Sequence, residues 1–387
     1  MLTWHIITGE YPPIVGGVSD YCQIVAEGLA GAGDDVHVWC PPLPRVATPN
    51  GVTVHPALGR ISPHDLRAVD RLLDGFPSPR RLLVQWVPHG FGYRSMNVGF
   101  CLWLRKRARL GDRVEIMVHE PYLAFGEGGV RWTAAASVHR VMTVILARAA
   151  CRIWIAIPDW ERRWRPYALG RDVPFAWLPV PSSLPLPAPD DVQRVRDRFR
   201  LRDGPVVGHL GSYGTVVTRA LSLSLPEILQ RSPDAVAVLL GRNGDSFYRQ
   251  FARDHPHLAP RTHAMGTLSS QELARHVGAC DLLVQPYQDG ISSRRTSAMA
   301  GLALGVAIVT TTGPLTEPIW AETCCVSLVS VDKPRALASE ALRLLSDDCA
   351  RRDLAARGRR IYTRQFDLPH TIGALRRAAQ EPCVLPS

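Results

Sequence analysis

The sequence predicts an α/β fold made of two doubly wound, mostly parallel-sheet domains in tandem. Its 387 residues exceed one ordinary core and fit two domains of about 180 to 200 residues each. Short apolar runs alternate with helical patterns in both halves, and this alternation implies right-handed crossovers and a mostly parallel sheet. A proline-rich break at residues 179–189 separates the two series.

The first half begins with an apolar run and a glycine-containing loop, residues 9–17. A helix is expected next, because apolar residues from Val18 to Leu29 recur at i, i+3, i+4, i+7, i+8 and i+11. A basic helix is expected around Leu102–Arg109. The predicted strands of this half are Trp4–Thr8, Val36–Cys40, Leu82–Trp86 and Val114–Val118.

The second half repeats the alternation and ends in arginine-rich helices. Its predicted strands are Val206–Leu210, Ala235–Leu240, Asp281–Gln285 and Val306–Thr310. Its predicted helices are Ala220–Leu229, Arg295–Leu304, Pro334–Leu345, Asp348–Thr363 and one after Asp367. We therefore expect an N-terminal domain over residues 1–180, a linker at 181–190 and a second domain at 191–365. The segment 366–387 is expected to pack back on the first domain.

The net charge of +10 comes almost entirely from arginine, since Lys106 and Lys333 are the only lysines. No basic-aromatic stripe or zinc spacing supports a nucleic-acid partner, and a substrate that carries phosphates is a simpler use for the arginines. The basic residues of the expected helix leave open a peripheral contact with anionic lipid, against a plain solvated helix face. These residues are Arg105, Lys106, Arg107 and Arg109.

The cysteines and apolar stretches indicate a cytoplasmic protein. Nine cysteines without a paired framework predict free thiols in a reducing compartment, and residues 1–8 show no signal-peptide pattern. The longest apolar stretch, Val141–Ile157, is interrupted by Arg148 and Arg152, which makes a bilayer crossing costly.

The loop after the first strand carries the first functional signal. Gly16 and Gly17 allow the backbone to approach a ligand closely, and the following helix N-terminus favours anions. A plain tight turn is the alternative interpretation.

The segment "GEYPPIVGGVSDY" resembles the opening of family 4 glycosyltransferases, which have the GT-B fold of two Rossmann-like domains facing a cleft. The resemblance continues in order along most of the chain. The further segments are "QWVPHGFG" at 85–92, "VHEPY" at 118–122, "LPVPSSLP" at 178–185, "VGHLGSYG" at 207–214, "LLGRNG" at 239–244 and "GISSRRTSAMAGLALGVAIVTTTG" at 290–313.

The resemblance implies that the nucleotide-sugar donor binds the second domain and the acceptor the first. The family's two glutamates, seven residues apart, are replaced here by Asp289 and Ser297. Asp289 retains a carboxylate for sugar hydroxyls, whereas a neutral Ser297 should weaken the hold on ribose by roughly 1–2 kcal/mol. A surface serine is the alternative. Glu317 is a candidate replacement for the missing glutamate.

A second departure concerns the diphosphate. Where the family places an arginine and a lysine, this chain has His209 and Tyr213, within a turn that offers backbone N–H groups and hydroxyls. Arg294 and Arg295 begin the helix after Asp289, so we hypothesise that at least one of them neutralises the diphosphate. Solvated surface arginines are the alternative.

The remaining candidates follow from the resemblance and from loop positions. His119 and Asp289 are the candidate catalytic residues, with Glu120 as an orienting neighbour and His89 as a second acceptor-side histidine. The candidate donor-binding residues are Gly16, Gly17, Gly211, Ser212, Tyr213, Arg242, Met265, Gly266, Leu268, Gly290, Ile291, Ser292, Ser293, Arg294, Arg295, Ser297 and Glu317.

The resemblance implies a retaining, metal-independent transfer from a UDP- or GDP-sugar to a sugar, lipid-linked or small-molecule hydroxyl. In it the leaving diphosphate takes the acceptor proton, which demands little beyond positioning and charge stabilisation. Two alternatives stay open. One is a non-catalytic GT-B module that binds nucleotide or a partner; the other is a sugar-nucleotide epimerase or pseudo-glycosyltransferase.

Overall fold

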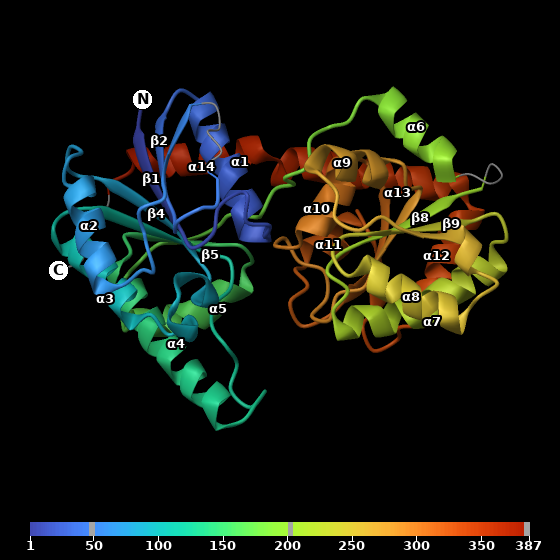
Figure 1. Ribbon diagram of the computed structural model, residues 1–387, viewed down its shortest axis with the longest axis horizontal. Helices are drawn as coiled ribbons and strands as arrows, with labels where there is room; N and C mark the ends of the chain where they lie inside the picture. Colours follow the sequence, from blue (N-terminus) through green and yellow to red (C-terminus); the bar gives the residue numbers. More distant parts are fainter. Residues whose placement is uncertain (46–50, 200–203, 383–387) are drawn as a thin grey trace. The chain divides into compact units, whose positions relative to one another are not determined.

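Two compact units make up the described chain, which the computed structural model covers over residues 1–45, 51–199 and 204–382. The first unit contains Met1–Val180 together with the chain from Leu368 onward, and the second contains Pro181–Asp367. Each unit is built around its own parallel sheet (Figure 1). The predicted α/β class with two parallel-sheet domains is therefore confirmed.

The first sheet has seven parallel strands in the order β3-β2-β1-β4-β5-β6-β7. Its strands are β1 Thr3–Thr8, β2 Asp35–Trp39, β3 Val52–His55, β4 Arg81–Trp86, β5 Arg113–Val118, β6 Arg152–Ile155 and β7 Phe175–Trp177. The chain runs outward from β1 to β3 and then returns to place β4 beside β1. Ligands of doubly wound folds bind outside the carboxyl ends of the strands at such a reversal. The loops after β1 and β4 therefore flank the expected ligand position of this unit.

Helices cover both faces of this sheet (Figure 1). They are α1 Gly17–Gly31, α2 Pro63–Leu73, α3 Val98–Arg109, α4 Val130–Ala149, α5 Asp159–Trp164 and α14 Leu368–Gln380. The last helix, α14, packs against α1 although it is far away in sequence. Its C-terminal carbonyl of Ala379 accepts hydrogen bonds from Arg81 at 2.8 Å and Arg113 at 3.2 Å. Arginine at a helix C-terminus satisfies carbonyls that lack an intrahelical donor.

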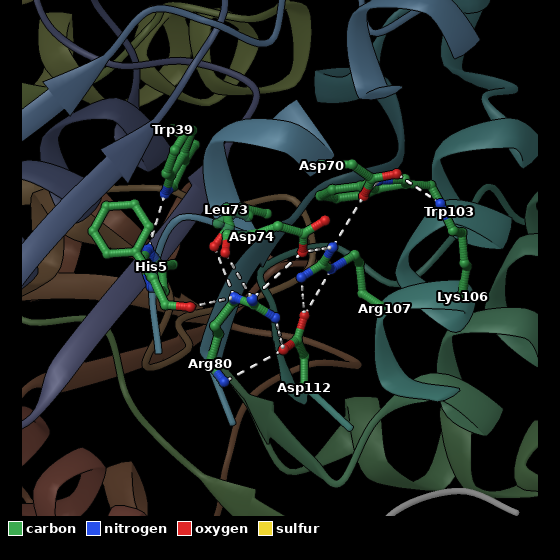
Figure 2. A network of polar contacts seen from close by, with 11 residues as sticks. His5, Trp39, Asp70, Leu73, Asp74, Arg80, Trp103, Lys106, Arg107 and Asp112 are labelled. Carbon is green, nitrogen blue, oxygen red and sulfur yellow. Dashed lines mark hydrogen bonds and ion pairs between the residues drawn. The ribbon is translucent and has the colours of Figure 1, made fainter. Parts of the chain in front are cut away.

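A buried ionic network joins α2, α3 and the start of β5 (Figure 2). Arg107 is fully buried, and its guanidinium donates to Asp112 at 2.6 Å and to Asp74 at 2.9 Å. The Asp112 side chain, itself inaccessible, also pairs with Arg80 at 3.2 Å. Lys106 pairs with Asp70 at 2.7 Å. Arg107 also lies 3.3 Å from Asp70, so its inaccessible guanidinium pairs with three carboxylates. Arg107 is thus not part of a solvated or lipid-facing helix surface.

The second sheet has six parallel strands in the order β10-β9-β8-β11-β12-β13. They are β8 Val206–Leu210, β9 Val236–Leu240, β10 Thr262–Ala264, β11 Leu282–Gln285, β12 Ala307–Thr312 and β13 Ser327–Ser330. The strand order reverses between β8 and β11, which are hydrogen-bonded neighbours. The loops after these two strands therefore flank the expected ligand position of this unit.

Two apolar clusters sandwich the second sheet, one on each face. One contains residues of α10 and the other residues of α7, α8 and α12. The helices are α6 Pro189–Phe199, α7 Thr215–Arg231, α8 Gly244–Asp254, α9 Ser270–Gly278, α10 Thr296–Ala303, α11 Ile319–Thr323, α12 Ala336–Ser346 and α13 Asp348–Ile361. Helix α7 begins five residues before the predicted start and contains Pro226.

The predicted apolar stretch 141–157 does not form one element: it is the end of α4 followed by β6. Within the described ranges, no helix has the length and apolar character that a membrane crossing requires. The eight described cysteines are all free thiols.

Candidate functional site

A cavity of about 330 Å³ lies at the strand-order reversal of the second unit. It is open between the start of α7, which follows β8, and the loop that joins β11 to α10. Its lining residues are Gly214, Thr215, Val216, Val217, Tyr287, Gln288, Asp289, Arg294 and Arg295. The structure therefore brings three predicted donor-site residues, Asp289, Arg294 and Arg295, to one hollow.

The N-terminus of α7 forms one wall. Gly214 is the N-cap residue, no side chain caps the helix, and the first turn contains no acidic residue. The first backbone bond of the helix runs from the N–H of Thr218 to the carbonyl of Gly214, at 2.9 Å. The N–H groups of the residues between them lack an intrahelical acceptor, and the helix dipole adds positive potential there. This wall suits an anion such as a phosphate.

The opposite wall carries two arginines and one carboxylate. The Oδ2 atom of Asp289 lies 3.7 Å from Arg294 and 3.6 Å from Arg295. The guanidinium of Arg295 also stacks over the ring of Tyr287, with its central carbon 4.9 Å from the ring centroid. The charged residues that line the cavity are thus two arginines and one aspartate. Together with the helix dipole, two guanidinium groups make the cavity favourable for an anion.

The loop that carries Asp289 is held by close backbone packing. Gly290 has a φ of +83°, and a Cβ there would lie 2.1 Å from the hydroxyl oxygen of Thr316 and 2.3 Å from the nitrogen of Gly313. Only glycine fits this position without moving the neighbouring backbone. The carbonyl of Asp289 accepts a bond from the N–H of Leu315 at 2.9 Å. The following residues Ile291 and Ser292 are fully buried.

Ser297, at the second position of the altered motif, lies in the first turn of α10. Its hydroxyl shares a 2.7 Å hydrogen bond with the hydroxyl of Tyr287. Burial raises the pKa of Tyr287 to about 12, so that hydroxyl keeps its proton at neutral pH. The two hydroxyls form a neutral pair beside the cavity lining.

Glu317, the candidate ribose acceptor, accepts hydrogen bonds from residues of its own unit. One carboxylate oxygen accepts bonds from the backbone N–H of Ser293, at 2.9 Å, and from its hydroxyl. The other accepts the indole N–H of Trp320 at 2.7 Å. Burial raises the pKa of Glu317 above its ordinary value. The structure thus uses this carboxylate to fix the loop before α10.

The turn after β8 holds the other predicted phosphate-loop residues. Tyr213 has a φ of +56° and is buried, and its hydroxyl donates to the carbonyl of His209 at 3.4 Å. Burial lowers the pKa of His209 to about 4, so His209 brings no positive charge at neutral pH. A Cβ on Gly241 would lie 2.3 Å from the carbonyl oxygen of Gly211, while Ser212 is exposed.

The remaining candidates of the second unit lie at the ends of β9 and β10. Arg242 is exposed just after β9. Gly266 has a φ of +61°, and its carbonyl accepts the N–H of Gly241 at 3.3 Å. Met265 and Leu268 are partly buried against the apolar cluster. Gly241 connects this region to the turn after β8, because it bonds to Gly266 and packs against Gly211. None of these candidates is among the residues that line the cavity.

In the first unit, His119 directly follows β5 and is buried, with 7% of its surface exposed. Its Nε2 atom lies 2.9 Å from Oε1 of Gln85, at the end of β4. Tyr21 meets the ring edge-on, with centroids 4.8 Å apart. Burial lowers the pKa of His119 to about 3. The imidazole is therefore neutral at neutral pH.

The other candidates of the first unit lie at the loops after β1, β4 and β5. His89 is exposed on a short 3₁₀ turn, Pro88–Phe91, and Glu120 is half-buried. A Cβ on Gly16 would lie 2.6 Å from Oε1 of Glu10, and that oxygen accepts the N–H of Ser19 at 3.1 Å. Glu10 therefore occupies the N-terminus of α1, where the sequence predicted an anion, and Gly17 is open on its side.

Glu10 and Gln85 contact candidate site elements but were not predicted from the sequence as site residues. Both lie inside the segments that carry the family resemblance: Glu10 is two residues after β1, and Gln85 is at the end of β4. A polar residue at the carboxyl end of a parallel strand was the available signal. Their partners, Ser19 and His119, are 9 and 34 residues away, and only the tertiary fold reveals those contacts.

Comparisons with known proteins agree with this geometry. The family described as "Glycosyl transferases group 1" matches residues 204–347, which include the whole cavity lining. A phosphatidyl-myo-inositol mannosyltransferase from Mycolicibacterium smegmatis is 26% identical over 369 residues, covering 89% of this chain and 85% of that protein.

Solved structures of GT-B proteins superpose on nearly the full chain. Sucrose-phosphate synthase from Thermosynechococcus elongatus has a TM-score of 0.73 at 16% identity, with 98% of each chain covered. HepE from Anabaena, in complex with UDP and glucose, has a TM-score of 0.68 at 14% identity, with 98% of this chain and 99% of that chain covered. These likenesses establish the fold.

Proposed function

Since the chain is a glycosyltransferase of the GT-B type that depends on a sugar nucleotide, we propose that it transfers a hexose from a UDP- or GDP-sugar to an acceptor hydroxyl. The transfer retains the anomeric configuration and needs no metal. The observation that carries this proposal is the cavity of the second unit, where the N-terminus of α7 faces Arg294 and Arg295.

The diphosphate of the donor binds between these two walls. It accepts hydrogen bonds from the free N–H groups of α7 and charge-assisted bonds from one or both arginines. Asp289, 3.6–3.7 Å from both guanidinium groups, orients them and accepts bonds from sugar hydroxyls. Ser297 and Tyr287 offer neutral hydroxyls to the donor.

The same groups stabilise the transition state. As the bond between sugar and diphosphate breaks, negative charge grows on the leaving phosphate, and a preorganised positive site favours that change. The leaving phosphate takes the proton of the acceptor hydroxyl on the same face of the sugar. The protein's task is then positioning and charge stabilisation, which the altered motif still supports.

The acceptor binds the first unit, near His119, whose neutral ring contacts the transferred sugar or the acceptor. His89 and Glu120 belong to the same proposal. HepE was crystallised with UDP and glucose, and the mycobacterial relative is named for a phosphatidyl-myo-inositol acceptor. These names support a nucleotide-sugar donor and a polyol or lipid-linked hydroxyl acceptor. The free cysteines support a reducing, cytoplasmic compartment.

The test is a transfer assay with the purified chain, a panel of UDP- and GDP-hexoses and sugar or phosphoinositol acceptors. NMR of the product reads the anomeric configuration, and parallel reactions contain EDTA. We expect an α-linked product from an α-linked donor and the same rate with the chelator. A product of inverted configuration contradicts retention, and complete loss with EDTA contradicts metal independence. Donor conversion without any acceptor would instead indicate an epimerase.

A further inference from the structure

The side chain of Gln85 contacts His119 across the neighbouring strands β4 and β5. Gln85 is the penultimate residue of β4, and His119 continues the pairing of β5 through its N–H, which donates to the carbonyl of Trp86 at 3.0 Å. The 2.9 Å contact joins Oε1 of Gln85 to Nε2 of the imidazole. Both side chains are buried.

This contact determines which ring nitrogen carries the hydrogen. In the orientation that the Gln85 amide has in this structure, its oxygen faces Nε2 of the imidazole. An amide oxygen only accepts hydrogen bonds, so in this arrangement Nε2 donates. Burial lowers the pKa of His119 to about 3, which keeps the ring neutral with a single N–H. The Nδ1 atom then carries a lone pair and makes no hydrogen bond with a residue in the described part of the chain. It is the nitrogen left for a ligand.

The rest of His119 is fixed as well. Its carbonyl accepts the indole N–H of Trp160 at 3.0 Å, and the Tyr21 ring meets the imidazole edge-on. These contacts fix the backbone and the plane of the ring but do not select a tautomer. Among the residues that the structure describes, only Gln85 supplies a hydrogen-bond partner to a ring nitrogen of His119.

Gln85 also carries an energetic cost that packing does not explain. Its Nε2 atom is buried and has no hydrogen-bond partner within the described ranges, and the whole residue is 1% exposed. A buried amide N–H without an acceptor is unfavourable and rare in native structures. A methionine or leucine would fill the space without this cost. An amide at this position is explained if the site requires its oxygen to accept the hydrogen bond from His119.

We propose that Gln85 is a positioning residue that holds His119 in the Nε2-protonated form, so that Nδ1 accepts a hydrogen bond from a hydroxyl of the bound sugar. This inference rests on the proposed function, because a sugar must reach His119. It adds that the neutral ring of His119 accepts a hydrogen bond from the sugar. Gln85, on the neighbouring strand β4, selects the tautomer that makes this possible.

The first experiment is ¹⁵N NMR of the histidine-labelled full chain, with His119→Ala used to identify the His119 signals. The expected result is Nε2 protonated and Nδ1 unprotonated. Gln85→Met keeps the length of the side chain but removes the amide oxygen that accepts the hydrogen bond. The tautomer population of His119 should then move to the Nδ1-protonated form, because a buried Nε2–H without a partner is unfavourable. Gln85→Glu keeps an acceptor and should keep the original tautomer. Gln23→Met, on the same unit, is the matched control.

The second experiment measures kcat and KM for the donor. Gln85→Met should lower kcat/KM by roughly 3- to 10-fold, the loss of one neutral hydrogen bond, and Gln85→Glu should restore most of it. Finding Nδ1 protonated in the unaltered protein overturns the proposal, whatever the variants do. So does an unchanged tautomer and rate in Gln85→Met. Absence of transfer by the unaltered protein would defeat the proposed function while leaving the tautomer result standing.

Discussion

Asp289 and Arg295 lie together on one wall of the cavity, with Oδ2 of the carboxylate 3.6 Å from the guanidinium. The aspartate replaces a longer glutamate of the family pattern, and the arginine begins the helix that follows it. Arg294 lies at nearly the same distance, 3.7 Å. The contact thus joins the aspartate of the altered motif to the guanidinium groups of the proposed donor site.

Removing this positive charge should weaken donor binding. We expect Arg294→Ala or Arg295→Ala to raise the Kd for UDP or GDP roughly 10- to 100-fold for the arginine that contacts the diphosphate, since a hydrogen bond to a charged group contributes about 1.5–3 kcal/mol. Isothermal titration calorimetry gives the values. Arg253→Ala, an exposed arginine of the same unit, should bind normally. Unchanged affinity in the double variant would remove the arginines from the site.

Glu317 should affect stability rather than ribose recognition. Glu317→Gln retains size but weakens three accepted hydrogen bonds from Ser293 and Trp320, so we expect a loss of about 1–3 kcal/mol in the free energy of unfolding. The exposed neighbour Glu322→Gln is the control. Denaturant titration measures the loss. A second titration compares Kd for UDP and 2′-deoxy-UDP; a change in that ratio in Glu317→Gln would assign the carboxylate to ribose after all.

The ionic network of the first unit should be essential for its stability. Among the described residues, Arg107→Met leaves the inaccessible carboxylate of Asp112 with Arg80 as its remaining ionic partner. Breaking a buried pair in this way costs about 3–5 kcal/mol. Arg109→Met, on the exposed face of the same helix, should cost less than about 0.5 kcal/mol. Thermal and urea unfolding measure the loss in the free energy of unfolding for each of the two variants. Equal, small losses in both variants would show that the network is not stabilising.

Mild acid should destabilise the fold through its buried histidines. Burial lowers the pKa of His5 and His119 to about 3 and that of His209 to about 4. The folded state therefore takes up these protons less readily than the unfolded state, whose histidines titrate near 6.5. Their stabilising contribution is complete above pH 6.5 and is lost as pH falls toward 3–4, by about 2 kcal/mol per histidine at pH 5.

The measurement is the free energy of unfolding between pH 7.5 and 5. His119→Gln should reduce its pH dependence by about one third of the combined contribution of His5, His119 and His209. His257→Gln, a histidine with an exposed side chain, is the control and should leave the slope unchanged. A flat stability profile over this range would contradict the burial of these rings as neutral species.

Much of the architecture was predictable because fully buried parallel strands give continuous apolar runs. The segments Leu82–Trp86 and Val206–Leu210 match β4 and β8 for this reason. Short strands at or near the sheet edges, such as β7 and β13, were missed, because they are only partly buried and lack such runs. Helix α7 extends to Thr215, although Thr-Val-Val at its start favours strands; contacts with β9 and α12 override that propensity.

The candidate site was predictable only in part. Asp289, Arg294 and Arg295 share one loop, so sequence placed them together and the structure brings them to one cavity. The partners of Glu317 and His119 were not predictable, since Ser293 and Gln85 are 24 and 34 residues away. Their roles in donor and acceptor binding stay predictions.

The most direct test of the central claim is a crystal structure of the chain with a bound UDP-hexose or GDP-hexose. We expect the diphosphate to lie between the N–H groups at the start of α7 and the guanidinium of Arg294 or Arg295, with the hexose hydroxyls near Asp289. A nucleotide whose phosphates lie elsewhere, with this cavity empty under saturating ligand, would contradict it.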